Sequence, residues 1–291
     1  MSGEAAAIGS AFLWALSSAM LRGLTAEVPS LALNALRSLV GMAAYAVIVT
    51  GSGKLPGFGQ FGAENLLFLT VNVGVGIVLG DTAYYSSMRQ IGLSRAMTIA
   101  STYPLLTAIL AGLFLGESFG PATWAGFVLC VGGVILVARS GLQPAQSGGG
   151  RALARGVWLA VAASALWAVG TVSLRRGSEG MDPFLVNFLR MSGVALVAGL
   201  WARARGEFGG IRRLAPSRVA LLVAGALIGS VIGTMLYLTA VQTAGASKAA
   251  VLASIAPLFS VPMSMLAGEP VNRRLVVGMA AAVAGIVIVL R

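Results

Sequence analysis

Residues 217–243 read SRVALLVAGALIGSVIGTMLYLTAVQT, a stretch in which Arg218 carries the only charge. A helix needs about 20 consecutive apolar residues to cross the hydrocarbon core of a lipid bilayer. This stretch meets that requirement, so we expect it to be a transmembrane helix. Its many glycine and alanine residues are typical of membrane helices whose backbones pack closely together.

The composition of the whole chain agrees with this first helix. Of its 291 residues, 57% are hydrophobic and 10% are charged, and the mean hydropathy is +0.90. Soluble domains are roughly 45–50% apolar and about 25% charged. A soluble fold could not bury so much apolar surface, so the sequence predicts an integral membrane protein with the lipid bilayer as its surroundings.

Nine further segments have the same apolar character, so we expect an all-α membrane protein with ten transmembrane helices. The expected helices cover residues 4–22, 30–50, 64–88, 92–116, 120–139, 153–175, 183–202, 217–243, 245–267 and 272–290. Residues 140–151 are rich in glycine, serine and glutamine, a composition typical of flexible linkers. This linker separates two predicted domains, residues 1–139 and residues 152–291.

These two halves repeat each other at an offset of 153 residues. The matching positions include Trp14 with Trp167, Arg37 with Arg190, Tyr84 with Tyr237, Arg95 with Lys248, and Pro104 with Pro257. The ordered set indicates an internal duplication. Each half has five helices, an odd number, so the second half enters the membrane from the opposite face. We therefore predict two inverted five-helix repeats, an arrangement in which substrate sites form near the membrane midplane.

The repeated motifs resemble those of the drug/metabolite transporter superfamily, and in particular its EamA-type branch of ten-helix permeases. The resemblance covers nearly the whole chain and includes Gly92-Leu-Ser-Arg-Ala, its counterpart Gly245-Ala-Ser-Lys-Ala, and Gly116-Glu117. It implies a secondary transporter in the cell (inner) membrane, similar to bacterial exporters of amino acids or other metabolites. Strict repetition fails at Asp81, whose counterpart is Thr234.

Three charged residues are expected inside the membrane. Arg37 and Arg190 lie in the second helix of each half, and Asp81 lies in the third helix. Charges at this depth are costly and often functional, so the arginines are candidate anchors for a substrate carboxylate. Asp81 is expected to pair with Arg37, and protonation or substrate binding would then break the pair. The alternatives are a permanent structural pair and arginines that only tie helices together.

Aromatic and amide side chains complete the predicted substrate site. They are Trp14, Asn34, Asn72, Tyr84, Tyr103, Trp167, Asn187 and Tyr237. Aromatic rings with a few polar groups suit a small amphipathic solute better than a bare ion. The alternative for the tryptophan and tyrosine residues is a place in the aromatic belts at the membrane interface.

The fourth and ninth helices carry further candidate residues. Arg95 and Lys248 begin these helices and are predicted gates at opposite mouths of the cavity, the alternative being side chains that only reach lipid head groups. Pro104 and Pro257 are expected to break the same helices, because proline has no backbone N–H. Glu117 is expected to bind the N-terminus of the next helix through its dipole.

Charge and residue counts exclude several functions. The net charge of +11 comes from arginine and lysine in the connections between helices, where they meet lipid head groups, so we do not expect nucleic-acid binding. The chain has no histidine and one cysteine, Cys130, and we expect neither a metal site nor a cofactor. Basic residues are commoner in the connections opposite the termini, which predicts that both termini lie outside the cytoplasm.

The sequence therefore predicts an exporter of small metabolites, foremost amino acids, aromatic or other amphipathic ones included, that works by alternating access around a midplane cavity. A broad-specificity drug exporter and an exchanger of sugar phosphates or nucleotide sugars are the alternatives. An intramembrane enzyme is a different class, which the lack of histidine and of a second intramembrane aspartate argues against. The expected partners are a small-molecule substrate and lipid, with protons as the candidate coupling ion, and we expect a monomer.

Overall fold

The computed structural model describes residues 1–140, 150–209, 211, 214–259, 263 and 273–289. Within these ranges the chain forms helices, turns and bends and contains no β-strand. The predicted linker at residues 140–151 lies almost entirely outside the described residues, as does the end of the helix predicted at 245–267. The structure therefore tests the helical architecture but not the boundary between the two predicted domains.

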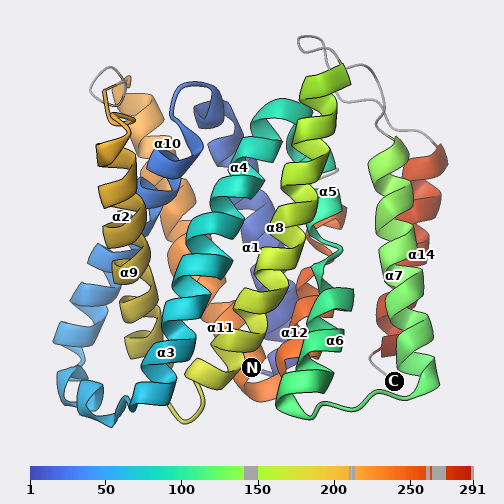
Figure 1. The fold of residues 1–291 in the computed structure, drawn as a ribbon, viewed down its shortest axis with the longest axis horizontal. Helices are drawn as coiled ribbons and strands as arrows, with labels where there is room; N and C mark the ends of the chain where they lie inside the picture. The colour runs from blue at the N-terminus through green and yellow to red at the C-terminus, as the bar shows by residue number, and fades with distance from the viewer. Residues whose placement is uncertain (141–149, 210, 212–213, 260–262, 264–272, 290–291) are drawn as a thin grey trace.

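The helices follow one another with short connections (Figure 1). The first half contains α1 (Gly3–Arg22), η1 (Gly23–Ala26), α2 (Ser30–Gly51), η2 (Leu55–Gln60), α3 (Ala63–Val71), η3 (Asn72–Leu79), α4 (Gly80–Ile91), α5 (Leu93–Ala100), α6 (Tyr103–Leu115) and α7 (Pro121–Ser140). The second contains α8 (Gly150–Gly177), α9 (Pro183–Ala204), α10 (Pro216–Ala226), η5 (Leu227–Gly233), α11 (Thr234–Ala244), α12 (Ala246–Ala253) and α14 (Arg273–Val289).

Six helices of the described chain are long and apolar enough to cross a membrane: Gly3–Ala26, Ser30–Gly51, Ala63–Ile91, Arg151–Gly177, Pro183–Ala204 and Pro216–Ala244. Four shorter apolar helices accompany them, at Tyr103–Leu115, Pro121–Gly133, Ala246–Phe259 and Val276–Gly285. The six long spans confirm the all-α membrane architecture. They also agree with the sequence in their bounds, since each predicted range differs from its helix by only a few residues.

The helices are arranged as a bundle with a pair at each side (Figure 1). At one side α2 packs against α9, and at the other α7 packs against α14. Between these pairs, α1 packs along η5 and α11, and α8 packs along η3 and α4. Both termini lie at the same end of the bundle, the lower end in Figure 1.

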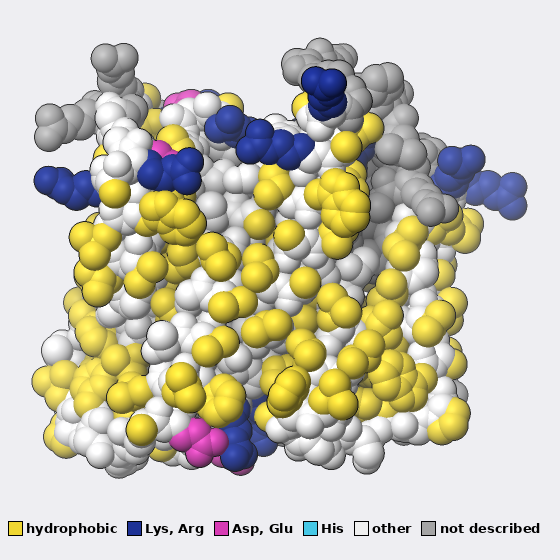
Figure 2. All heavy atoms as spheres, viewed as in Figure 1, with side chains coloured by type: hydrophobic (Ala, Val, Ile, Leu, Met, Phe, Trp, Pro, Cys, Tyr) yellow, Lys and Arg dark blue, Asp and Glu magenta, His cyan; other side chains and the backbone are white. Residues whose placement is uncertain are grey.

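The outer surface has the character of a membrane protein. Apolar side chains cover the middle of the face seen in Figure 2, while Lys and Arg gather at its upper and lower rims. Large apolar side chains such as Leu113, Phe114 and Trp158 are more than 70% exposed. In water this surface would be unfavourable, whereas hydrocarbon chains of lipid can cover it without cost.

Glycine makes the sharp turns that begin two central helices. Gly92 separates α4 from α5 with φ +84°, and Gly245 separates α11 from α12 with φ +89°. A side chain at either position would be strained in this conformation. The repeated Gly-x-Ser motif in the sequence thus corresponds to the same backbone turn in both halves.

The prediction that Glu117 binds the N-terminus of the following helix is wrong. Its carboxylate accepts hydrogen bonds from the backbone N–H groups of Ala246 at 3.0 Å and Ser247 at 3.4 Å. These groups belong to the first turn of α12 in the other half of the chain, not to the following helix α7. A carboxylate satisfies the free N–H groups of any nearby helix start, and the fold brings α12 closer.

Candidate functional site

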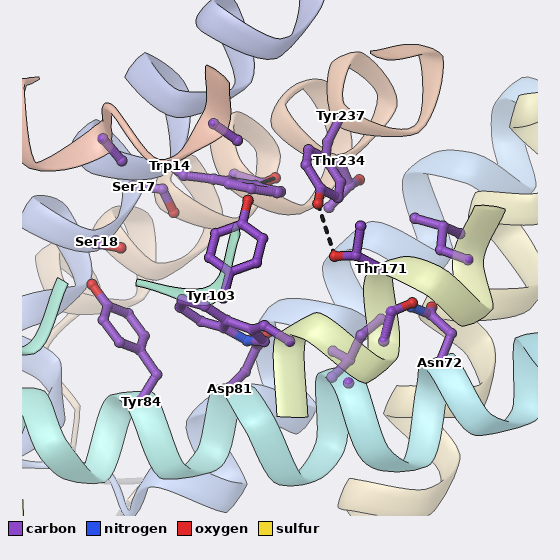
Figure 3. A pocket seen from close by; sticks show the side chains of 18 of the residues that line it. Trp14, Ser17, Ser18, Asn72, Asp81, Tyr84, Tyr103, Thr171, Thr234 and Tyr237 are labelled. Carbon is purple, nitrogen blue, oxygen red and sulfur yellow. Dashed lines mark hydrogen bonds between the residues drawn. The ribbon is translucent and has the colours of Figure 1, made fainter. Parts of the chain in front are cut away.

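A central cavity of about 130 Å³ lies between the long helices. One water molecule occupies about 10–15 Å³ on this measure, so the cavity has room for roughly ten waters or one small solute. Its walls come from both halves of the chain, namely from α1, α2, η3 and α4 through α6 on one side and from α8, α9, η5, α11 and α12 on the other. Figure 3 shows these side chains converging from several helices.

Nine of the eleven predicted substrate-binding residues line this cavity. They are Trp14, Arg37, Asn72, Asp81, Tyr84, Tyr103, Trp167, Arg190 and Tyr237. The structure therefore brings together residues that lie as far apart in the sequence as the first and eighth predicted helices. That they bind substrate stays a prediction.

Asn34 and Asn187 lie behind the cavity wall and hold the two arginines. The Asn34 side-chain oxygen accepts from Arg37 Nε at 3.2 Å, and that of Asn187 accepts from Arg190 Nη1 at 2.6 Å. Each asparagine precedes its arginine by three residues, a spacing that puts both side chains on one face of a helix. Both amides are fully buried, so they orient the guanidinium groups rather than face the space for a solute.

Arg37 and Asp81 form the ion pair that the sequence predicts. Arg37 Nη2 contacts Asp81 Oδ2, while Arg37 Nη1 donates to the Ser230 hydroxyl at 2.9 Å. The other carboxylate oxygen of Asp81 accepts from Trp167 Nε1 at 2.8 Å. Asp81 thereby connects α4, α2 and α8, and both of its oxygens are hydrogen-bonded.

Arg190 has a different environment. Its Nε donates to Asn72 at 2.7 Å and its Nη1 to Asn187 at 2.6 Å. Both acceptors are neutral amides, and no salt bridge within the described part of the chain includes Arg190. The side chain is buried, with the residue 5% exposed.

The aromatic residues form the apolar part of the wall. Trp14 packs against Tyr237 with ring centroids 4.7 Å apart and ring planes tilted by 49°, and the Trp167 ring lies 5.2 Å from that of Tyr84 and 6.0 Å from that of Tyr103. The Trp14 Nε1 donates to the carbonyl oxygen of Gly229 at 3.2 Å. These contacts lie deep in the bundle, so the two tryptophans are not part of an interfacial belt.

Irregular helix geometry surrounds the site. The segments η3 and η5 are wound as π-helix in the middle of their spans, a form that often marks functional positions. α5 ends at Ala100 and α12 at Ala253, in each case four residues before a proline, Pro104 or Pro257. Proline frees the carbonyl four residues earlier, which explains where both helices stop.

The predicted gate residues lie away from the cavity wall. Arg95 is half-buried near the start of α5, and Lys248 is exposed near the start of α12. α5 begins at the upper end of the bundle and α12 near the lower end (Figure 1). Neither residue lines the central cavity, so a role as gates would require a different conformation.

Several lining residues were not predicted. They include Ser17, Ser18, Tyr85, Met97, Thr171, Thr234 and the glycines Gly76, Gly170 and Gly229. Small and weakly polar residues of this kind are common throughout membrane helices, so only the packing reveals which of them face the cavity. The Thr171 hydroxyl, for example, lies 2.8 Å from the Tyr237 hydroxyl across two helices.

The cavity has no set of side chains suited to a metal ion. Within the described residues, no group of three His, Cys, Asp or Glu side chains could hold one. The formal charges in its described lining are those of Arg37, Asp81 and Arg190. Hydrogen bonding, charge and aromatic contact are therefore the means by which this site can bind a solute.

Comparison with known proteins identifies the family. The EamA-like transporter family matches residues 1–139 and 154–291. The chain belongs to the EamA-like transporter family, within the drug/metabolite transporter superfamily. It is therefore a multi-pass membrane protein and a transporter, and the family indicates transport rather than catalysis.

Individual EamA-like relatives have names of the same kind. The uncharacterized transporter YvbV of Bacillus subtilis (strain 168) is 28% identical over 224 residues, which cover 74% of this chain and 70% of that protein. An uncharacterized transporter of Archaeoglobus fulgidus is 22% identical over 228 residues, covering 78% and 77%. A solved crystal structure superposes with a TM-score of 0.75 at 20% identity over 98% of this chain and 94% of its own, which shows that the fold is shared.

Proposed function

We propose that this EamA-like transporter exports small metabolites, foremost amino acids, by alternating access between two inverted five-helix repeats of ten transmembrane helices in all. The observation that carries the proposal is the central cavity, whose walls combine matching residues of both halves, such as Trp14 with Trp167 and Arg37 with Arg190. Inverted repeats that meet at a midplane site can expose it to either face by rocking.

The helix interruptions support this mechanism. The π-helical turns in η3 and η5, and the breaks after α5 and α12, lie beside the cavity in both halves. Interrupted helices at membrane depth are tolerated where they line a cavity and can bend during transport. A protein that only held partners in the membrane would not need such breaks at matching positions.

Size and chemistry of the cavity favour a small amphipathic solute. Aromatic rings cover an apolar body, and the charged and amide groups orient a polar one. This pattern suits amino acids, including aromatic ones, better than it suits sugar phosphates or nucleotide sugars, which need several converging basic groups. A broad-specificity drug exporter would use the same aromatic wall and remains the second candidate.

The Arg37–Asp81 pair is the candidate coupling element. Protonation of Asp81 would break this pair with Arg37, and the uptake of that proton would link export to the proton gradient. Arg95 and Lys248, near helix starts at opposite ends of the bundle, are proposed to act at its two mouths. We further propose that the protein works as a monomer in the inner membrane with both termini outside the cytoplasm.

Counterflow in proteoliposomes tests the function. Vesicles loaded with one unlabelled amino acid at a time are diluted into its labelled form, and a transporter concentrates the label transiently. We expect accumulation with at least one amphipathic amino acid and none in vesicles without protein. Accumulation of labelled sugar phosphate or of a cationic drug, but of no amino acid, would favour the alternatives. No accumulation of any solute, together with turnover of one, would support an enzyme.

A further inference from the structure

We propose that Arg190, and not Arg37, is the anion receptor of the cavity, and that it binds the single carboxylate of the transported solute. The inference deepens the proposed function, because it assigns the charge class of the solute to one side chain. The two arginines occupy matching positions in the two halves, and a sequence pattern treats them as equal. Their surroundings in the structure are not equal.

Arg37 already has an anionic partner. It donates to Asn34 from Nε, to Ser230 from Nη1 and to Asp81 from Nη2. All three nitrogens of the guanidinium group thus have protein acceptors, one of them a full negative charge. A solute carboxylate could bind Arg37 only by displacing Asp81, which would leave a buried carboxylate without its cation.

Arg190 lacks this neutralisation. Its Nε and Nη1 donate to the amide oxygens of Asn72 and Asn187, and its Nη2 donates no hydrogen bond to the residues that the structure describes. The repeat offset matches Asp81 with Thr234, so the second half has a hydroxyl where the first has a carboxylate. Arg190 therefore offers a fixed, forked set of donors of the kind that binds carboxylate groups.

Charge balance points to the same residue. The described lining of the cavity contains Arg37, Asp81 and Arg190, and therefore one positive charge in excess. An uncompensated charge inside a membrane protein is costly, and a carboxylate group bound to Arg190 would relieve that cost at this side chain. A phosphate group with two negative charges would outweigh the single excess positive charge of the described lining. The charge balance therefore favours a solute with one carboxylate group.

Two further hydroxyl groups in the same cavity have no well-formed hydrogen bond within the described structure. The hydroxyls of Tyr84 and Tyr103 are buried, and neither makes a hydrogen bond within the described structure, although Ser18 and Tyr237 lie near them. Tyr84 is 4% and Tyr103 is 5% exposed. A buried hydroxyl without a partner is unfavourable, so both are ready to bind polar atoms of a solute whose carboxylate is on Arg190. Figure 3 shows Tyr84 and Asn72 at opposite ends of the cavity.

Acid and amide pairs of the same solute test the assignment. The probes are L-phenylalanine with L-phenylalaninamide and L-leucine with L-leucinamide, each measured by counterflow and by the rise in thermal unfolding midpoint of the purified protein. We expect the wild type to prefer the acids at least tenfold. Arg190→Gln should reduce binding and transport of the acids by about tenfold or more and change the amides less than threefold. Arg203→Gln, an exposed position on the same helix α9, should behave as wild type.

A second variant separates recognition from folding. Thr234→Asp introduces a carboxylate at the position that matches Asp81, so it should neutralise Arg190, preserve or raise the unfolding midpoint and still abolish the preference for acids. Equal binding of acids and amides by the wild type, or an acid preference that survives both Arg190→Gln and Thr234→Asp, would overturn the assignment even if transport occurs. Arg190-dependent binding of acids without any counterflow would instead preserve the assignment and refute the transport function.

Discussion

The two halves of the molecule place the same residues around the cavity but use them differently. In the first half, Arg37 is neutralised by Asp81, and Trp167 of the other half donates to the same carboxylate. In the second half, Thr234 replaces the carboxylate, and Trp14 donates to the carbonyl oxygen of Gly229 instead. All three guanidinium nitrogens of Arg37 therefore have protein acceptors, one of them a carboxylate, whereas Arg190 has two neutral acceptors and no carboxylate.

Under the proposed inverted-repeat mechanism, this difference would let the two halves contribute unequally to transport. Alternating access would require the inward-facing and outward-facing states to be close in energy. A single difference between the halves, Asp81 against Thr234, leaves Arg37 paired with a carboxylate and Arg190 without one. The comparison predicts that equivalent mutations in the two halves will have unequal effects.

The largest effect is expected from Asp81→Asn. It leaves Arg37 buried without a counter-charge, and breaking one partner of a buried pair costs about 3–5 kcal/mol. We expect a large fall in the thermal unfolding midpoint in detergent and at least a tenfold loss of counterflow. Thr234→Val, the matching change in the second half, removes a neutral hydroxyl that donates to the carbonyl of Ser230 and lies 3.3 Å from the Tyr45 hydroxyl, and it should cost much less.

The same variant tests coupling through Asp81. If Asp81 carries the proton, any residual transport by Asp81→Asn should no longer depend on the pH difference between the interior and the exterior of the vesicles. The double variant Asp81→Leu with Arg37→Met should regain much of the lost stability, because apolar groups can replace a buried pair, but not the pH dependence. Full transport with an unchanged pH profile in Asp81→Asn would end the coupling proposal.

An intermediate effect is expected from the two indole groups. Trp167 and Trp14 each pack against a glycine. A Cβ atom added at Gly80 would lie 2.9 Å from the indole Cδ1 of Trp167, and one added at Gly233 would lie 3.0 Å from that of Trp14. Replacing either indole by phenylalanine removes a similar apolar area and one N–H donor. Trp167 donates to a carboxylate, and a hydrogen bond to a charged group contributes about 1.5–3 kcal/mol to stability. Trp14 donates to a neutral carbonyl, and such a hydrogen bond contributes about 0.5–1.5 kcal/mol.

Unfolding midpoints of Trp167→Phe and Trp14→Phe, measured side by side, give the difference directly. We expect Trp167→Phe to be the less stable variant and to show the larger loss of transport, because Asp81 then has Arg37 alone. Equal losses would mean that both tryptophans act only through their ring area. A larger loss in Trp14→Phe would reverse the roles that we assign to the two halves.

The sequence predicts the helices well because apolar length is a local property. Charged and glycine-rich turns bound each apolar run, so residues such as Pro183 and Gly245 mark helix starts without any knowledge of packing. The large site residues are predictable for a related reason. Arg37, Asp81 and Arg190 are so costly in lipid that their positions already indicate a polar interior.

The remainder of the site depends on contacts between distant segments. Ser17 and Thr171 resemble many other small residues until the fold turns them toward the cavity. The inequality of the arginines also lies beyond the sequence pattern, because Asn72 reaches Arg190 from another helix and another half. Likewise, the hydrogen bond from the first turn of α12 to Glu117 becomes apparent only in the three-dimensional structure.

The smallest effect is expected at the helix starts outside the membrane, where the halves differ again. Asp182 caps α9 by accepting from the N–H of Phe184 at 2.8 Å and of Leu185 at 3.4 Å, and it pairs with Lys54. The matching residue in the first half is Pro29, which gives α2 no side-chain cap. Partial burial alone would raise the pKa of Asp182, but Lys54 and the two N–H groups outweigh it and lower the pKa below its usual value.

A lowered pKa in the folded state means that Asp182 stabilises the protein when ionised. This stabilisation is complete above the ordinary pKa of an aspartate, about 3.9, and is lost as the pH falls through the lower folded value. Asp182→Ala should cost about 1 kcal/mol at neutral pH, as for other helix caps, and the wild type should lose this advantage in acid. Pro29→Ala, which removes no cap, should change neither the neutral stability by a comparable amount nor its pH dependence. Unfolding midpoints of the three proteins at pH 7 and pH 3 would show whether the difference between the halves extends to their surfaces.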